Sequence, residues 1–285
     1  VLNLKREEGR EIFLKLAREY DVVLEGFRPG VARRLGIDYE TLRKVNPKII
    51  YCSLSGYGQD GPYRELPGHD LNYISFAGIA YLIGEKGGKP VIPLNLIADY
   101  AGASLHAVIG VLLAIIAREK IGEGQFIDIS YTRGALALLQ ASPIFHYFMA
   151  MKKLPRRGET LLGGGYPYYG IYRTKDDKFI SIGCIEHHLW ENFLKAIGRE
   201  DFLRLKFSPK HFVEPAGEEW EEVRRELERI FMEKTRDEWF EFLKDKNVPV
   251  GKVYTLDEIS NDPVSYTHLR AHETRHDLVC RLLLE

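Results

Sequence analysis

Strand-like and helix-like segments alternate over the first 54 residues of this 285-residue chain. Residues 6–20 carry apolar side chains at helical spacing, and residues 21–25 then read as a strand. Residues 38–45 predict a second helix, and residues 48–54 a second strand. Because neighbouring parallel strands need a crossover connection, usually a helix, this alternation predicts a parallel α/β sheet.

The pattern changes in the second half of the chain. Further helices are predicted at residues 75–82, 100–119 and 132–151, with a strand at 125–130, and residues 1–5 read as one more strand. Residues 152–168 are rich in Gly and Pro and predict a linker. After it, residues 170–174 and 178–182 flank an Asp-Asp turn and predict a hairpin, followed by helices at 188–197, 218–234 and 235–244. We therefore predict a large α/β domain over residues 1–155 and a smaller α+β domain over residues 156–263.

The last 22 residues have a different origin in our interpretation. From Val264 the chain reads Val-Ser-Tyr-Thr-His-Leu-Arg-Ala-His-Glu-Thr, which resembles a translated transposase-type sequencing adapter. Residues 278–285 fit the other end of that adapter in the same frame. We predict that residues 264–285 are a non-native tail and leave them out of the reasoning on fold and function. His268, His272 and His276 have helical spacing, but this origin argues against a metal site there.

Composition excludes several classes of partner. A formal net charge of −1 favours neither nucleic acid nor an anionic membrane surface as a partner. The longest apolar run, residues 107–117, is far shorter than the roughly 20 residues of a membrane span, so we predict a buried helix. Cys52 and Cys184 lack C-x-x-C spacing and are predicted to be buried thiols of a reducing compartment. The predicted location is the cytoplasm.

A histidine and an aspartate stand out as a candidate acid/base pair. His69 follows the Gly- and Pro-rich residues 56–62, and Asp99 lies where an apolar run gives way to a long apolar helix. Their ordinary pKa values of about 6.5 and 3.9 let one be protonated while the other is ionised. The alternatives are a core histidine for His69 and a helix N-cap for Asp99.

Gly56, Gly58 and Gly61 match the G-x-G-x-x-G pattern of dinucleotide-binding sites after a strand. Pro62 follows the third glycine, and no helix N-terminus is predicted there to receive a pyrophosphate. We therefore interpret this segment as a turn that leads to His69.

Two further positions carry charge at the ends of predicted strands. Arg28 follows the strand 21–25, with Arg33 and Arg34 one turn later, where ligands of parallel sheets bind. These arginines could contact phosphates of a nucleotide-like carrier, or could form a solvated basic helix start. Glu186 closes the second hairpin strand and could equally cap the next helix.

These segments together resemble the class III CoA-transferase (CaiB/BaiF) superfamily, and within it the α-methylacyl-CoA racemases. The strings that carry the resemblance are Phe-Arg-Pro-Gly from Phe27, Gly-His-Asp-Leu-Asn-Tyr from Gly68, residues 95–100, residues 163–169 and residues 172–174. The resemblance implies a Rossmann-like parallel-sheet large domain, a smaller α+β domain and an intertwined homodimer. Members carry one more strand–helix unit before Val1 and a returning C-terminal segment, so we expect this chain to be truncated at both ends.

The resemblance also implies roles for individual residues. His69 and Asp99 would exchange protons on the two faces of the substrate, and Glu186, in Gly-Cys-Ile-Glu where racemases have Gly-Ala-Ile-Glu, would orient His69. Backbone amides at the helix start near Asp99 are candidate donors to an enolate oxygen. The implied CoA-binding residues are Leu2, Asn3, Leu4, Lys5, Gly26, Phe27, Arg28, Arg34, Gly68, Asp70, Leu71, Asn72 and Tyr73. The family string Leu-Asp-Leu-Lys stands here as Leu-Asn-Leu-Lys, with Asn3 as the departure.

The implied reaction is epimerisation of the α-carbon of a 2-methylacyl-CoA thioester through an enolate. One alternative is CoA transfer between carboxylic acids with Asp99 as nucleophile, which has no need of His69 and Glu186. A second is a non-catalytic acyl-CoA-binding paralogue. No metal or redox cofactor is implied, because the thioester itself makes the α-proton acidic and coenzyme A is part of the substrate.

Overall fold

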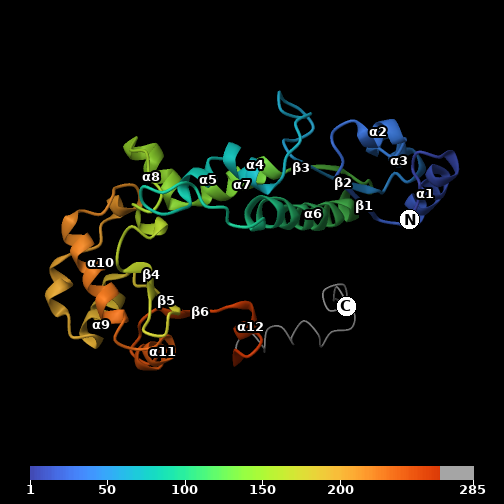
Figure 1. The fold of residues 1–285 in the computed structure, drawn as a ribbon. Coiled ribbons are helices and arrows are strands. Elements are labelled where there is room, and N and C mark those ends of the chain that lie inside the picture. Colours follow the sequence, from blue (N-terminus) through green and yellow to red (C-terminus); the bar gives the residue numbers. More distant parts are fainter. Residues whose placement is uncertain (264–285) are drawn as a thin grey trace. The chain divides into compact units, whose positions relative to one another are not determined.

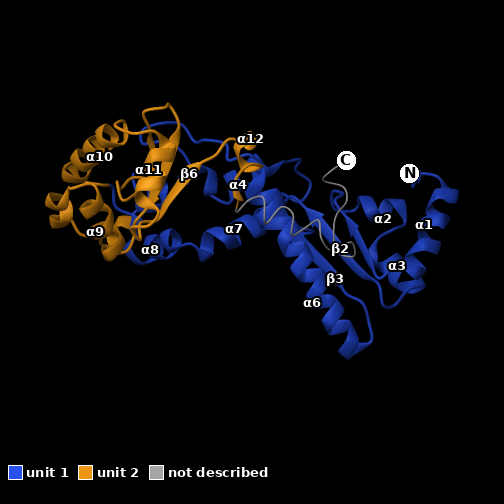
Figure 2. Ribbon diagram, turned by 90° about the horizontal axis from the view of Figure 1, so that it is seen from below, with its two compact units in different colours: residues 1–163, 212–215 blue, residues 164–211, 216–285 orange. Residues whose placement is uncertain are grey.

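The computed structural model describes residues 1–263 and falls into two compact units (Figures 1 and 2). Unit 1 comprises residues 1–163 and 212–215, and unit 2 comprises residues 164–211 and those from 216 onward. The division follows Gly163, within the Gly- and Pro-rich segment that the sequence marks as a connection. The predicted adapter origin of residues 264–285, with their three histidines, lies outside the described residues.

Unit 1 is built on a three-stranded parallel sheet. Its strands are β1 (Val22–Glu25), β2 (Ile50–Ser55) and β3 (Phe126–Ser130), in the order β1-β2-β3. Its helices are α1 (Glu7–Glu19), α2 (Val31–Leu35), α3 (Tyr39–Val45), α4 (Asp70–Phe76), α5 (Ile79–Leu82), α6 (Leu105–Ile121), α7 (Tyr131–Ala141) and α8 (Pro143–Met151), with the π-helix η1 (Leu96–Ser104) and the 3₁₀ turn η2 (Leu161–Gly163). The predicted parallel α/β sheet is confirmed.

The alternation of side chains along β2 explains the layers of unit 1. Tyr51 points to one face and packs with Ala17 of α1 and Leu42 of α3. Cys52 and Leu54 point to the other face, where they pack against η1 and α6. Since every residue of β2 is buried, the central strand is covered by helices on both faces.

Three local predictions are corrected. Residues 1–5 form no strand. Residues 4 and 5 lie in a turn, because the Asn3 side chain accepts the Lys5 N–H at 3.1 Å and its carbonyl accepts the Arg6 N–H. The helix predicted from residue 75 begins at Asp70 and is broken at Gly78, whose φ of +80° is left-handed. The helix predicted over 132–151 is broken at Ser142, because Pro143 lacks an N–H and must start a new helix.

The helix predicted over residues 100–119 is longer than expected. It runs without a break from Leu96 to Ile121, its first nine residues being the π-helix η1. By length and apolar composition alone, the helix of residues 96–121 could cross a membrane. The pair α7–α8 also passes this test when taken as one segment, but it is bent by 73°. One face of the long helix lies on the sheet of unit 1 (Figure 1). The prediction of a buried helix over residues 107–117 is wrong for the other face, where Val108, Ile109, Leu112, Leu113 and Ile116 are more than half exposed. The absence of a membrane partner stays a prediction.

Unit 2 combines a small antiparallel sheet with helices. Its strands are β4 (Tyr169–Arg173), β5 (Phe179–Gly183) and β6 (Val250–Val253), and its helices are α9 (His187–Ala196), α10 (Glu218–Phe231), α11 (Arg236–Leu243) and α12 (Leu256–Ile259), with 3₁₀ turns η3 (Glu200–Arg204) and η4 (Pro209–Phe212). The predicted hairpin is confirmed as β4–β5. Strand β6 was not predicted, because Val-Gly-Lys-Val is short and contains glycine.

The core of unit 2 is aromatic. Tyr172 of β4 stacks on Phe231 of α10 with ring centroids 4.6 Å apart, and Phe193 of α9 lies 6.0 Å from the same ring. Residues 152–168, predicted as a linker, are partly structural: Leu161, Tyr166 and Tyr168 are at most 2% exposed.

Candidate active site

A cavity of about 840 Å³ lies in unit 1 where the three parallel strands end. Residues 26–29 follow β1, residues 54 and 55 end β2 and Gly56 follows it, and Tyr131 follows β3 directly. All of them line the cavity. In parallel α/β sheets, ligands bind outside the carboxyl ends of the strands. The topology of unit 1 therefore places this cavity where a substrate is expected.

His69 and Asp99 both line this cavity. His69 stands at the N-cap of α4 with extended backbone, its N–H held by Oδ1 of Asn72 at 3.1 Å, and its side chain is exposed. Asp99 is the fourth residue of η1, so the alternative that it is the N-cap is wrong; Asn95 occupies that position. The Nδ2 of Asn95 donates to Oδ2 of Asp99 at 3.3 Å.

Asp70 ties the His69 segment to the Asp99 helix. Its side chain is only 3% exposed, and its Oδ2 accepts the N–H of Ala98 at 2.7 Å and of Asp99 at 2.9 Å. The first amides of a helix have no partner within the helix, and a carboxylate there is stabilised by the helix dipole. The prediction that amides near Asp99 serve an enolate is therefore wrong for these two, because Asp70 occupies them.

Side chains and a close backbone contact support the π-helix η1. Ser104 Oγ donates to the carbonyl of Asp99 at 2.8 Å, and His106 Nδ1 lies 3.1 Å from the carbonyl of Ala101. A methyl group added to Gly134 of α7 would lie 1.7 Å from the carbonyl oxygen of Gly102. The backbones of η1 and α7 are thus in contact. π-Helical turns occur frequently at functional sites.

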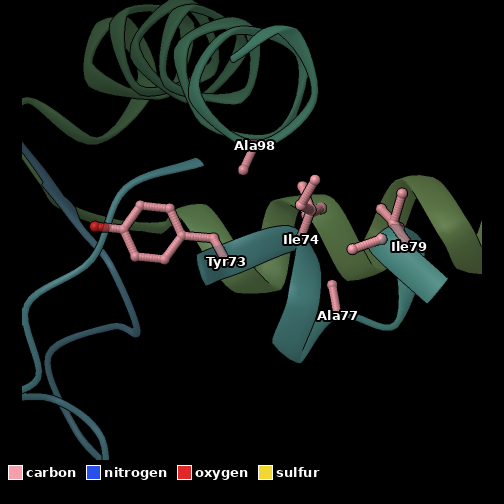
Figure 3. Close-up of a cluster of buried hydrophobic side chains, with 7 residues drawn as sticks. Tyr73, Ile74, Ala77, Ile79 and Ala98 are labelled. Atoms are coloured by element: carbon pink, nitrogen blue, oxygen red, sulfur yellow. The ribbon is translucent and has the colours of Figure 1, made fainter. Parts of the chain in front are cut away.

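Two tyrosines form an aromatic wall of the cavity. Tyr73 and Tyr131 both line it, and their rings stack with centroids 5.1 Å apart and an interplanar angle of 24°. Tyr73 packs with Ile74 and Ala98 in one buried cluster, with its ring reaching past α4 toward the loop (Figure 3). Its hydroxyl donates to the carbonyl of Gly68 at 2.5 Å. Burial, followed by neighbouring phenols and Asp99, raises the pKa of Tyr73 to about 12.

The predicted CoA-binding residues divide into two groups. Those that line the cavity are Gly26, Phe27, Arg28, Gly68, Asn72 and Tyr73. Those that do not are Leu2, Asn3, Leu4, Lys5, Arg34, Asp70 and Leu71. The Arg28 side chain makes no hydrogen bond or ion pair within residues 1–263. It is therefore available to a ligand phosphate.

Several lining residues had no predicted role, among them Arg64, Asn95, Tyr100 and Tyr131, although Asn95 and Tyr100 lie in the string 95–100 that carries the resemblance. For Tyr131 a signal was present, because it directly follows a predicted strand of a parallel sheet. The other three lie on loops and helix starts whose positions depend on tertiary packing.

Glu186 belongs to unit 2, whereas His69 and Asp99 belong to unit 1. It stands at the N-cap of α9, but its exposed side chain makes no capping hydrogen bond. Its pairing with His69 stays a prediction.

Other candidate sites carry less chemistry. Cys52 and Cys184 are free and buried as predicted, and burial raises the pKa of their thiols to about 11 and about 12. Gly56, Gly58 and Gly61 lie in a loop that reaches no helix before Asp70, in agreement with the prediction of a turn. Within residues 1–263, no cluster of three or more His, Cys, Asp or Glu side chains could hold a metal ion.

Known proteins resemble this chain in sequence and in structure. α-Methylacyl-CoA racemase from Homo sapiens is 35% identical over 260 residues, which are 91% of this chain and 65% of the racemase. Acetyl-CoA:oxalate CoA-transferase from Acetobacter aceti is 34% identical over 92% of this chain and 66% of its own length. The crystal structure of a CaiB/BaiF family protein from Brucella suis superposes with a TM-score of 0.75 at 28% identity, covering 93% of this chain and 68% of that one.

The chain thus spans about two thirds of the length of these relatives. The predicted class III CoA-transferase fold is confirmed by the structural match. The family model for CoA-transferase family III matches residues 1–279 and extends into the segment from Val264, whose adapter origin stays a prediction. The chain belongs to CoA-transferase family III.

Proposed function

We propose that this protein inverts the α-carbon of 2-methylacyl-CoA thioesters by removing and returning the α-proton. The observation that carries the proposal is the meeting of His69 and Asp99 in one cavity at the carboxyl ends of the strands. The α-methylacyl-CoA racemases from human and mouse, 35% and 36% identical to this chain, support it.

The reaction needs a base on one face of the α-carbon and an acid on the other. One of His69 and Asp99 takes the α-proton, and the C–H electron pair forms the Cα=C bond while the thioester oxygen becomes negative. The other group then donates a proton to the opposite face, and the two exchange roles with the hand of the substrate. Glu186 would orient His69. The thioester supplies the acidity, so we propose no metal or redox cofactor.

The CoA part of the substrate would enter beside residues 26–29. Arg28 lines the cavity with its guanidinium unpaired, and guanidinium groups bind phosphate through charge-assisted hydrogen bonds. We place the phosphates of CoA at this side and the acyl group near His69 and Asp99.

CoA transfer between carboxylic acids is the second candidate. The 34% identity to an acetyl-CoA:oxalate CoA-transferase favours it, and Asp99 in the cavity would be the nucleophile that forms an acyl anhydride and then a CoA thioester. A non-catalytic acyl-CoA-binding paralogue is the third, and the presence of His69, Asp99 and Glu186 together argues against it.

Deuterium uptake at the α-carbon of a 2-methylacyl-CoA in D₂O tests the proposal, with the complete natural protein that contains this sequence. We expect uptake and inversion at the α-carbon with the parent, and no inversion with His69→Ala or Asp99→Ala, since either loss leaves one face without a proton carrier. Hydroxylamine is then added during incubation with acyl-CoA and a carboxylate acceptor. Uptake that survives Asp99→Ala, together with trapping of an Asp99 hydroxamate in the parent, would establish CoA transfer instead.

A further inference from the structure

The enolate of the proposed reaction needs a hydrogen-bond donor at its oxygen, and several donors around the cavity are already committed. The amides of Ala98 and Asp99 bond to Asp70. Asn95 Nδ2 bonds to Asp99, and Ser104 Oγ donates to the carbonyl of Asp99. These committed groups lie on or beside η1, where the substrate carbonyl is expected.

Tyr131 is different, because its hydroxyl makes no hydrogen bond within residues 1–263. It is half-buried, lines the cavity with His69 and Asp99, and begins α7 directly after β3. The hydroxyl of Tyr73, in contrast, is bound to the carbonyl of Gly68. Tyr131 is therefore a phenol in the same cavity as His69 and Asp99 with an unused donor. Tyr100 also lines the cavity, but it is 56% exposed, whereas Tyr131 is half-buried.

The ring of Tyr131 is held in place by its neighbours. It stacks on Tyr73 and packs against the clusters that contain Ala98 and Ala103 of η1. A fixed donor costs little reorganisation when charge develops in the transition state, which is why such donors stabilise oxyanions efficiently. Burial, and then the charge of Asp99, raise the pKa of Tyr131, so the phenol keeps its proton near neutral pH.

We propose that Tyr131 is a catalytic residue whose hydroxyl donates a hydrogen bond to the thioester oxygen as it becomes an enolate. The phenol proton stays on Tyr131, and the α-proton moves only between the α-carbon and the pair His69 and Asp99. This inference rests on the proposed racemase function. The hydroxyl of Tyr131 is needed neither for packing of the ring nor for CoA binding at residues 26–29, so its removal tests the enolate contact alone.

Tyr131→Phe tests this because it keeps the stacked ring and removes only the oxygen. We expect the rate of α-proton exchange to fall about 100-fold, as for other single oxyanion donors, with the Kd for acyl-CoA within two-fold of the parent. Tyr57→Phe is the matched control, because Tyr57 packs 5.4 Å from Tyr73 but does not line the cavity. Its exchange rate should equal that of the parent. Circular dichroism and the melting temperature check that each variant is folded.

The outcomes separate this inference from the proposed function. If Tyr131→Phe exchanges as fast as the parent while His69→Ala does not invert the α-carbon, the role of Tyr131 is wrong and the racemase proposal stands. If exchange is slowed only through a weaker Kd, Tyr131 binds substrate and does not act on the enolate. If the parent shows no exchange and His69→Ala changes nothing, the proposed function itself is wrong.

Discussion

Asp70 joins two helices through a single buried carboxylate. The resemblance places it among the CoA-binding residues, whereas the structure uses its Oδ2 for the amides of Ala98 and Asp99. An aspartate that holds the backbone of Asp99 also sets where the neighbouring His69 stands relative to it. The two candidate proton carriers are therefore positioned by a residue that does not itself line the cavity.

Asp70→Ala should lower the free energy of unfolding by about 2–3 kcal/mol, because it leaves two amide donors unsatisfied. Urea denaturation followed by circular dichroism measures this loss. Asp99→Ala is the control and should cost less, since within residues 1–263 the Asp99 side chain accepts only the 3.3 Å bond from Asn95. Equal losses for both variants would show that Asp70 does not hold η1.

Arg28→Ala should weaken acyl-CoA binding roughly ten- to a hundred-fold, the value of a charge-assisted phosphate contact. Turnover of bound substrate should change far less, because Arg28 follows β1 and would contact the CoA part only. Titration calorimetry with acyl-CoA measures the Kd. Arg43→Ala serves as the control, because Arg43 pairs with Glu40 and does not line the cavity. An unchanged Kd for Arg28→Ala would leave that arginine as a solvated helix start.

At the scale of elements, the sequence predicted those strands and hairpins whose pattern of apolar and polar residues is local. The strands β1, β2 and β3 and the β4–β5 hairpin follow from short apolar runs between polar segments. The π-helix η1 does not, because its first amides are bound by Asp70, 28 residues earlier in the chain. The same limit applies to the site: His69 and Asp99 were predicted largely through family resemblance, whereas Tyr131 depends on where β3 ends in the sheet.

Contact between η1 and α7 depends on glycine at the point where their backbones meet. Gly134→Ala would place a methyl group 1.7 Å from the Gly102 carbonyl oxygen, so the helices must separate. We expect a loss of about 1–3 kcal/mol in stability, typical of overpacking, and slower α-proton exchange because η1 carries Asp99. Gly217→Ala, where the methyl group meets no atom within 4 Å, is the control. Parent-like stability of Gly134→Ala would contradict this close contact.

Helix α12 is attached to α11 by an ion pair that responds to pH. Both Glu258 oxygens accept from Arg236, and Lys178 donates to Glu258 as well. These hydrogen bonds hold the pKa of Glu258 well below its usual value. A carboxyl whose pKa is lowered by folding stabilises the folded state fully at pH values above its unfolded pKa of about 4.3. This stabilisation is lost as the pH falls from there toward the lower pKa of the folded state.

Amide hydrogen exchange in α12 should therefore be slower in the parent than in Glu258→Gln at pH 7. The difference between the two exchange rates should shrink progressively as the pH falls below about 4. Comparison of both proteins at each pH removes the intrinsic pH dependence of exchange. A difference that persists unchanged at low pH would mean that packing, and not the ion pair, holds α12.

At the scale of the whole molecule, α6 leaves one apolar face uncovered in unit 1. Side chains at helical spacing are each more than half exposed along it: Leu105, Val108, Ile109, Leu112, Leu113 and Ile116. The opposite face, with Ala107 and Ala114, is buried. A contiguous apolar stripe of this kind is typical of a protein contact, and the family resemblance implies a homodimer.

We propose that this face is the subunit contact of a homodimer. The double substitution Ile109→Glu and Leu113→Glu should then turn the proposed dimer into a monomer in sedimentation velocity, because two buried charges would oppose the contact. Circular dichroism should be unchanged, since both side chains point away from the sheet of unit 1. Lys120→Glu, an exposed charge reversal near the end of the same helix, should remain dimeric. If the double variant remains a dimer, the subunit contact lies elsewhere. If the parent floats with lipid vesicles, the predicted absence of a membrane partner is wrong.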